Sequence, residues 1–223
     1  MPKLPSFWKR ISRPEIERGT GKELSERHWA RLAKKDLLGR QTWPINGTTL
    51  ENIEWNLGYS FIEEISKRLS SGKKQVRVLD AGCGVGTTLN NLKQKFGNSV
   101  RTVGLTLQKT PGESYSGVDR IIEDRIERVE PKESFDIIFS YSGAHFHSKQ
   151  KLAAIQRTIS LLKVGGDAVI DLATNNLGSG VPERHEIKTL LRANGITQWN
   201  LRKVGQGKPV VLTFTKPKIK LPR

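Results

Sequence analysis

The 223-residue sequence is poor in cysteine and has no long apolar run. A single cysteine excludes an internal disulfide and a zinc site built from several cysteines. A membrane-spanning helix needs about 20 apolar residues in a row, and no part of the sequence supplies them. The basic N-terminal segment also lacks the apolar core of a secretory signal. We therefore expect a cytoplasmic protein without a transmembrane segment.

Acidic residues are outnumbered: 22 Asp and Glu stand against 38 Lys and Arg, so the formal net charge is +16. Residues 1–40 hold 11 basic and 5 acidic residues, and residues 198–223 hold 7 basic and no acidic ones. Such ends are suited to phosphate, either on nucleic acid or on an anionic lipid surface. A solvated surface on a soluble protein explains the same charge, and composition alone does not separate these interpretations.

The pattern along the chain divides it into three parts. Residues 1–48 mix proline, glycine and basic residues with one amphipathic helix, and we expect a basic arm that can act as a substrate lid. Residues 49–216 alternate short apolar runs with amphipathic helices, which is typical of a parallel sheet covered on both faces. Residues 217–223 form a basic tail.

Within the central part, a helix is predicted over residues 50–69, and five strands then alternate with helices or loops. The long helix after the fourth strand is predicted to end at the paired glycines 165–166. Two β-like runs around "GQGKP" predict a hairpin, which places the last strand antiparallel to its neighbour. The fold class is α/β: a doubly wound, mostly parallel sheet of seven strands with an antiparallel last strand.

The stretch "VRVLDAGCGVGTTL" follows the first strand with Asp80 and three glycines, Gly82, Gly84 and Gly86. Ligands of open α/β sheets bind beyond the C-terminal ends of the strands, and glycines let a ligand approach the backbone closely. The G-x-G-x-G spacing is neither that of a dinucleotide loop nor that of a Walker loop. An acid beside the loop repels phosphate and attracts a cationic ligand. S-adenosylmethionine, with its sulfonium and ammonium groups, fits this description.

This stretch resembles the first motif of the class I S-adenosylmethionine-dependent methyltransferases. The runs "FDIIFSYS" and "LLKVGGDAVIDL" and the closing hairpin resemble later parts of the same family, over roughly residues 50–216. The resemblance implies the Rossmann-like methyltransferase fold, S-adenosylmethionine as cofactor and methyl transfer as the activity.

The resemblance also implies that the loop after strand one holds the methionine part of the cofactor. The loop residues concerned are Asp80, Gly82, Cys83, Gly84, Gly86 and Thr87. In the family, the acid lies near the ammonium group or near a water bound to it. Cys83 is expected to pack within the loop rather than to act as a nucleophile.

Strand two ends without the acid that the family usually offers to the ribose hydroxyls. The chain has Thr106, Leu107 and Gln108 there, and a similar "GLTLS" stretch occurs in the cyclopropane-fatty-acid-synthase branch of the family. Thr106 and Gln108 are therefore implied as ribose contacts. Asp124 ends strand three, where the family places an acid against the adenine amino group, and Arg125 follows it. An exposed turn acid is the alternative interpretation of Asp124.

Candidates for the chemistry lie in "SYSGAHFHSKQ" after strand four, where the family places the reacting methyl group. Ser140 is a further candidate cofactor contact, and Tyr141 either lines the acceptor pocket or packs under the loop. His145 and His147 are candidate general bases, but in an extended loop at most one of them points inward. The structural alternatives are a helix-start and a rim histidine. Two histidines without a third ligand do not predict a metal site.

Three functions remain open on the sequence. The first is methylation of a small-molecule or lipid-like acceptor, which the aromatic residues before strand one favour. The second is methylation of RNA held by the basic ends, although the Asn/Asp-Pro-Pro-aromatic motif of exocyclic-amine enzymes is missing and the single cysteine lies in the cofactor loop. The third is an inactive binding module, which the intact glycine loop argues against.

Overall fold

The computed structural model describes residues 49–107, 109, 115–174, 181–203 and 209–217. The predicted basic arm, residues 1–48, lies outside the described residues, as do residues 218–223 of the predicted tail. The strands are β1 Val76–Ala81, β2 Val100–Thr106, β3 Arg120–Glu123, β4 Phe135–Ser140, β5 Leu162–Thr174, β6 Trp199–Lys203 and β7 Pro209–Thr215. The helices are α4 Leu50–Leu57, α5 Phe61–Ser70, α6 Thr87–Phe96, α7 Ala144–His147, α8 Lys151–Leu161 and α9 Arg184–Ala193.

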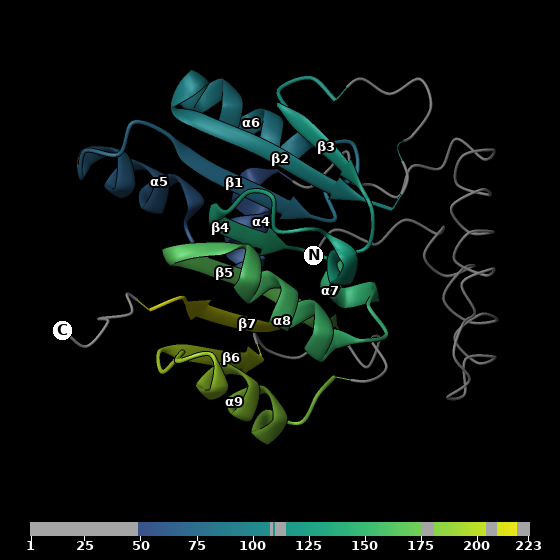
Figure 1. The fold of residues 1–223 in the computed structure, drawn as a ribbon. Coiled ribbons are helices and arrows are strands. Elements are labelled where there is room, and N and C mark those ends of the chain that lie inside the picture. The colour runs from purple at the N-terminus through teal and green to yellow at the C-terminus, as the bar shows by residue number, and fades with distance from the viewer. Residues whose placement is uncertain (1–48, 108, 110–114, 175–180, 204–208, 218–223) are drawn as a thin grey trace, which may run out of the picture. The chain divides into compact units, whose positions relative to one another are not determined.

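The strands form one seven-stranded sheet in the order β3-β2-β1-β4-β5-β7-β6 (Figure 1). The pairs among β1 to β5 are parallel, and β7 is antiparallel to both of its neighbours. The predicted fold class is therefore confirmed, including the reversed last strand. The hairpin reverses the chain after β6, so β7 lies between β5 and β6.

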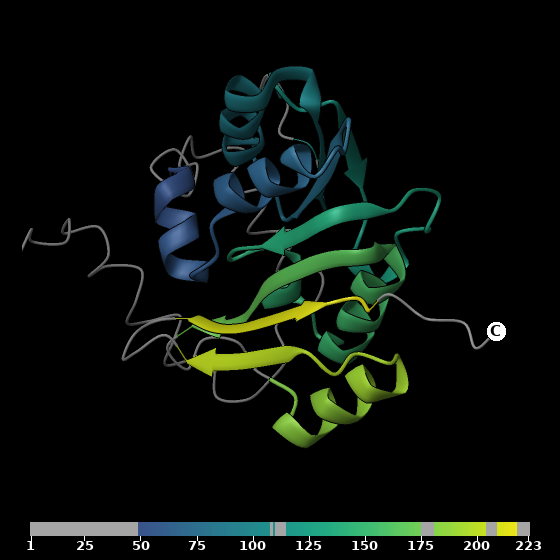
Figure 2. The same ribbon diagram turned by 90° about the vertical axis from the view of Figure 1, so that its left-hand side faces the viewer.

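Helices cover both faces of this sheet, as Figure 2 shows. Apolar residues of α4, α5 and α6 pack on one face, against Val76 and Val78 of β1. Apolar residues of α8 and α9 pack on the other face, against Leu79 and Ala81. Neighbouring residues of β1 thus point to opposite layers, which explains why the strand reads as a continuous apolar run.

Two boundaries differ from the sequence prediction. The helix predicted over residues 50–69 is two helices, because Gly58 adopts the left-handed conformation and ends α4. The paired glycines do not end α8; Gly165 and Gly166 lie inside β5, which begins at Leu162. A Cβ on Gly166 would lie 3.0 Å from the Phe135 carbonyl oxygen, so the close approach of β4 requires the glycine there.

A buried carboxylate, Asp136 of β4, links the first residues of β1, β4 and β5 by hydrogen bonds. Asp136 is 1% exposed and accepts hydrogen bonds from the backbone nitrogen of Arg77 at 2.7 Å and from Lys163 at 3.0 Å. Lys73 also donates to this carboxylate. Burial by itself raises the pKa of Asp136, but these hydrogen bonds and charges outweigh it, so the pKa lies below its ordinary value.

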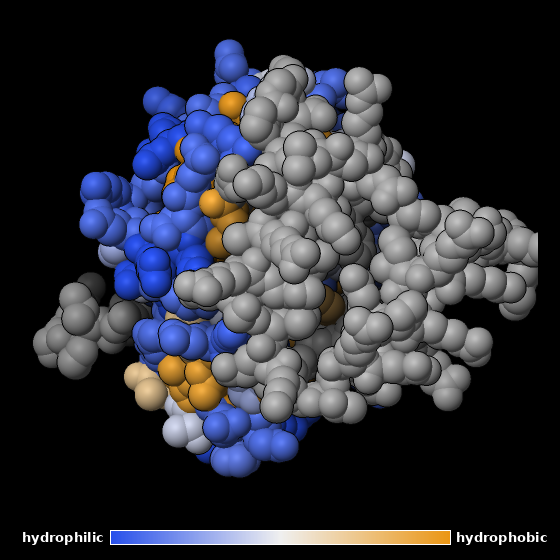
Figure 3. All heavy atoms as spheres, turned by 90° about the vertical axis from the view of Figure 1, so that its right-hand side faces the viewer, coloured by the Kyte–Doolittle hydropathy of each residue, from blue (hydrophilic) through white to orange (hydrophobic). Residues whose placement is uncertain are grey.

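Figure 3 shows the side of the molecule toward which β1, β2 and β3 point in Figure 1. Most of the described residues visible there are hydrophilic, and the hydrophobic ones form small separate groups. No helix in the part of the chain that the structure describes is both long and apolar enough to span a membrane.

Candidate functional site

The glycine loop after β1 is a tight, left-handed turn that starts α6. Gly82, Gly84 and Gly86 have φ angles of 121°, 52° and 83°, which residues other than glycine rarely adopt. The backbone nitrogens of Gly82 and Cys83 both donate to the Leu105 carbonyl of β2, at 2.9 and 3.0 Å. The loop is therefore held to the neighbouring strand by its backbone.

The loops after β1 and β4 approach each other through two glycines. A Cβ on Gly82 would lie 2.3 Å from the Gly143 Cα, and a Cβ on Gly143 would lie 2.4 Å from the Ala81 carbonyl oxygen. Neither position leaves space for a side chain. Gly143 was not predicted from the sequence, although the "SG" that follows an apolar strand was the available signal.

Cys83 is a packing residue, as the sequence favoured. Its side chain is 5% exposed, and a Cβ on Gly104 of β2 would lie 2.5 Å from its sulfur. Burial and the nearby Asp80 raise the pKa of the thiol. A thiol in this state is protonated and has little nucleophilic character.

Asp80 ends β1 beside the loop and is 5% exposed. No hydrogen bond to its carboxylate occurs among the described residues. Burial, followed by the charge of Asp171, raises the pKa of Asp80 to about 8. A buried carboxyl group without a partner is costly when ionised, and a cation placed against it relieves that cost.

Asp171 of β5 is a second buried acid at this end of the sheet, and it was not among the residues predicted from the sequence. Its Oδ2 accepts a hydrogen bond from the Ser142 backbone nitrogen at 2.7 Å, while its Oδ1 is buried without a partner. Burial raises the pKa of Asp171 to about 7. An acid inside the apolar run "AVIDLA" was the signal that could have identified it.

The candidate ribose and adenine contacts lie side by side at the ends of β2 and β3. Thr106 is partly buried, and its carbonyl accepts a hydrogen bond from the Asp124 nitrogen at 3.0 Å. The Asp124 carboxylate accepts from the Arg125 nitrogen at 2.7 Å. Leu107 is 66% exposed. Gln108 lies outside the described residues.

His145 is fully buried in α7 rather than placed at the surface of the site. Its Nε2 lies 2.7 Å from the Thr158 hydroxyl of α8, and its Nδ1 has no partner. Burial and the nearby Lys151 ammonium lower its pKa to about 3. The ring is therefore neutral at physiological pH and has little affinity for a proton.

The remaining candidates after β4 are distributed between the core and the surface. Ser140 is fully buried and its hydroxyl has no partner. Tyr141 is partly buried, and dehydration together with the charge of Asp171 raises its pKa. His147 is exposed at the surface, but desolvation of the ring by the neighbouring protein, followed by the charge of Lys151, lowers its pKa. The two histidines therefore occupy different environments, although they lie in α7 and not in the extended loop that the sequence prediction assumed.

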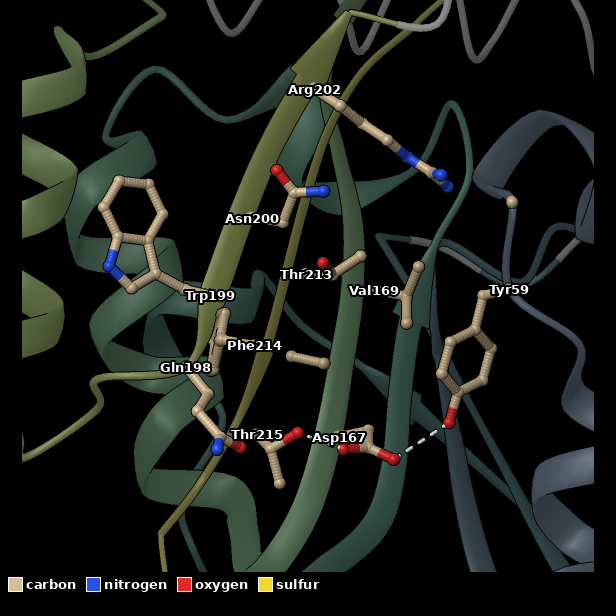
Figure 4. A pocket seen from close by; sticks show the side chains of 12 residues that line it. Tyr59, Asp167, Val169, Gln198, Trp199, Asn200, Arg202, Thr213, Phe214 and Thr215 are labelled. Atoms are coloured by element: carbon tan, nitrogen blue, oxygen red, sulfur yellow. Dashed lines mark hydrogen bonds between the residues drawn. The ribbon is translucent and has the colours of Figure 1, made fainter.

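A polar hollow of about 580 Å³ lies elsewhere, on the face of the sheet over β5, β7 and β6 (Figure 4). Tyr59 donates a hydrogen bond to Asp167 at 3.0 Å, and Thr215 donates to the same carboxylate at 2.6 Å. Arg202 donates to the Leu57 carbonyl at the end of α4. No residue of the glycine loop lines this hollow. Among the residues described here, no group of three or more His, Cys, Asp and Glu side chains could hold a metal ion.

Residues 78–166 match a family model described as a methyltransferase domain. No curated protein matches the chain. The matched segment begins in β1 and includes both loops that meet at Gly82 and Gly143.

Several solved structures have a similar fold at low sequence identity. The 1,6-didemethyltoxoflavin-N1-methyltransferase of Burkholderia thailandensis has a TM-score of 0.52 and 17% identity, covering 88% of this chain and 92% of that one. The N-methyltransferase NodS of Bradyrhizobium japonicum has a TM-score of 0.52 and 16% identity, covering 84% of this chain and 98% of that one. Both structures hold S-adenosylhomocysteine. A TehB-like protein of Corynebacterium glutamicum has a TM-score of 0.50 and 16% identity, covering 85% and 97%.

Proposed function

This chain belongs to the class I S-adenosylmethionine-dependent methyltransferases, and we propose that its methyl acceptor is a small molecule or a lipid-like compound. The observation that carries the donor assignment is the buried carboxyl group of Asp80, which has no hydrogen-bond partner among the described residues, beside the glycine-rich loop. A cation placed against this carboxyl group favours its ionised form, which suits the ammonium end of S-adenosylmethionine.

The proposed donor site follows the C-terminal ends of β1, β2 and β3. Asp80 and the backbone of Gly82 and Gly84 hold the amino-acid part, and Gly86 and Thr87 open α6 behind it. Ser140 borders this site from β4. Its buried, unpaired hydroxyl supports a role in binding, because an unsatisfied polar group costs about 1–3 kcal/mol.

The nucleoside part is proposed to lie across the ends of β2 and β3. Thr106 and Gln108 contact the ribose hydroxyls, Asp124 contacts the adenine amino group, and Leu107 and Arg125 flank them. The hydrogen bond between the Asp124 nitrogen and the Thr106 carbonyl supports this, because it brings both positions to one edge.

When bound, S-adenosylmethionine supplies an electrophilic methyl group on a good leaving group. The task of the chain is then to hold an acceptor in line with that methyl group, and such positioning accounts for up to roughly 7–11 kcal/mol of a barrier. Tyr141 and His147 are the proposed acceptor-side residues. The lowered pKa of His147 keeps its imidazole neutral at pH 7, so it is able to accept a proton.

His145 is proposed as a structural residue, because its ring is fully buried against Thr158. The low pKa of the imidazole makes it a weak proton acceptor. Of the two histidines that the sequence suggested as bases, the exposed one is therefore the better candidate.

Two features support a small acceptor. The loop after β4 carries "SYSG" instead of the motif of exocyclic-amine nucleic-acid enzymes. The names of two proteins with the same fold describe N-methyltransferases, one of them bound to the small molecule 1,6-didemethyltoxoflavin. The alternative of an RNA methyltransferase rests on the basic ends, of which residues 1–48 lie outside the described part.

Transfer of a tritiated methyl group into fractionated cell extract tests the acceptor class. We expect label in the metabolite or lipid fraction, and label in RNA would contradict the proposal. Binding to RNA gives a second test, because a protein that contacts 6–10 phosphates of duplex DNA loses affinity by about 10³–10⁵-fold between 50 and 200 mM salt. We expect no comparable salt-sensitive RNA binding.

A further inference from the structure

Two carboxyl groups are buried on the same face of the sheet, near the donor site. Asp80 points to the layer of α4, α5 and α6, as its alternation with Leu79 and Ala81 requires. Val169 also belongs to that layer, so Asp171, two residues later in β5, points the same way. Asp80 is level with Phe139, which is level with Val169. Asp171 therefore lies two residues, or about 7 Å, closer to the C-terminal strand ends than Asp80, and β4 runs between their two strands.

Neither carboxyl group forms an ion pair among the described residues. The Asp171 side chain is 0% exposed and holds one hydrogen bond, from the Ser142 nitrogen. Lys151 of α8 is the cation that acts on Asp171, but its ammonium donates to the carbonyls of His145, Phe146 and Ser148 at 3.0, 2.7 and 3.2 Å.

The other groups that act on the pair do not neutralise it. Burial and the charge of Asp171 raise the pKa of Tyr141, and burial and the charge of Asp80 raise the pKa of Cys83. Both side chains are therefore neutral at physiological pH. Two buried carboxyl groups that repel each other titrate as a pair and resist complete ionisation. The raised pKa values of about 8 for Asp80 and about 7 for Asp171 agree with this geometry.

Resting on the proposed function, we propose that the Asp80 and Asp171 pair retains a proton in the free protein and releases it to solvent when the ammonium end of the donor binds. The positive charge then replaces the proton as the partner of the pair. In this scheme Asp171 is a positioning residue, because it does not contact the reacting atoms.

Ser142 connects the ionisation of Asp171 with the loop on the acceptor side. This residue has a φ of 49°, in the left-handed region that favours glycine, and its nitrogen donates to Asp171 at 2.7 Å. A hydrogen bond to an ionised carboxylate is stronger than one to a neutral carboxylic acid. Donor binding therefore strengthens the contact that holds the loop of Tyr141, and the donor is expected to bind before the acceptor.

Calorimetry of S-adenosylhomocysteine binding to the full chain counts the protons directly. Titrations at pH 7 in phosphate and in Tris buffer, which differ in ionisation enthalpy, should show release of about one proton. The affinity should then rise about tenfold from pH 6 to pH 7, because one proton must leave. Binding without proton release would overturn the proposal. Failure to bind at all would contradict the proposed function instead, so the two outcomes are distinct.

The Asp171→Asn variant separates proton retention by the pair from a structural role. Its amide oxygen can still accept the hydrogen bond from Ser142, but it removes the like charge beside Asp80. We expect a smaller proton release and a pH dependence displaced to lower pH. The matched control is Glu130→Gln, which removes an exposed acid paired with Lys132 and should keep the wild-type proton count. An unchanged count in Asp171→Asn contradicts the proposal.

Infrared spectroscopy provides a readout that needs no variant. The wild-type chain at pH 7 should show a carboxylic-acid C=O band that decreases when S-adenosylhomocysteine is added. A band that is missing before addition, or that is unaffected by it, contradicts the proposal even if the Asp171→Asn variant does not fold.

Discussion

The Asp80 carboxyl group is stabilised in its protonated form by the fold and in its ionised form by a bound cation. Its pKa is raised from 3.8 to about 8, so the stability that it contributes is present below about pH 4 and is lost as the pH rises through 8. Asp80→Asn imitates the protonated form. The ligand-free variant should exceed the wild type in stability by ~1 kcal/mol or more at pH 8, with little difference at pH 4.

Thermal unfolding at these two pH values measures the difference, and calorimetry of the same variant should show loss of S-adenosylhomocysteine binding. Equal stability at pH 8 would mean that the carboxyl group is not buried as described. Wild-type affinity would instead refute the donor site.

The two histidines after β4 are expected to respond differently to replacement by alanine. His145→Ala removes a buried ring and leaves the Thr158 hydroxyl with fewer partners, which should destabilise the fold by about 2–4 kcal/mol. His147→Ala removes an exposed ring, so stability should change little, while the low-pH limb of the rate profile should change. Chemical denaturation and initial rates across pH check both; a reversed pattern would return His145 to the mechanism.

Among the elements, the loops after β1 and β4 depend on their mutual approach. Gly143 has a φ of −109° and a ψ of −142°, outside the regions that other residues favour, so Gly143→Ala tests the close approach together with this backbone conformation. The new Cβ would displace the Ala81–Gly82 backbone, and we expect binding of S-adenosylhomocysteine to weaken at least tenfold in a folded protein. Circular dichroism and calorimetry measure the two effects.

Gly97→Ala is the control for this variant. Nothing lies within 4 Å of a Cβ at Gly97, and its positive φ of 54° costs the alanine about 1–3 kcal/mol of stability. Its donor affinity should match that of the wild type. If both alanine variants bind normally, the contact between the loops does not shape the donor site.

For the whole molecule, acid sensitivity is expected to start at Asp136. This carboxylate ties the start of β1 to β4 and β5, and its lowered pKa means that the stability it contributes is present above pH 4 and is lost as the pH falls through the folded value. Asp136→Asn breaks a buried charge network and should cost about 3–5 kcal/mol at pH 7. The difference from the wild type should decrease toward pH 3, and urea denaturation at both pH values measures it.

Local patterns were sufficient to predict the sheet, its reversed strand and the glycine loop. Each of these depends on residues that are close in sequence: apolar runs, the spacing of three glycines, and the turn signal of the hairpin. The errors occurred where two strands or layers meet. Gly166 lies within β5, at a point where β4 passes too close for a side chain. Gly58 divides the first predicted helix, although the apolar spacing continues across it.

The sequence by itself determined the fold class, the position of the donor loop and the presence of an acid at its rim, because backbone geometry and apolar periodicity are local properties. Only the tertiary structure decided which polar side chains are buried together. Asp171 and Gly143 come from strand ends remote from the glycine loop in sequence, and the folded sheet brings Asp171 to the same buried face as Asp80 and places His145 in the core. The chemistry expected of these groups follows from that burial.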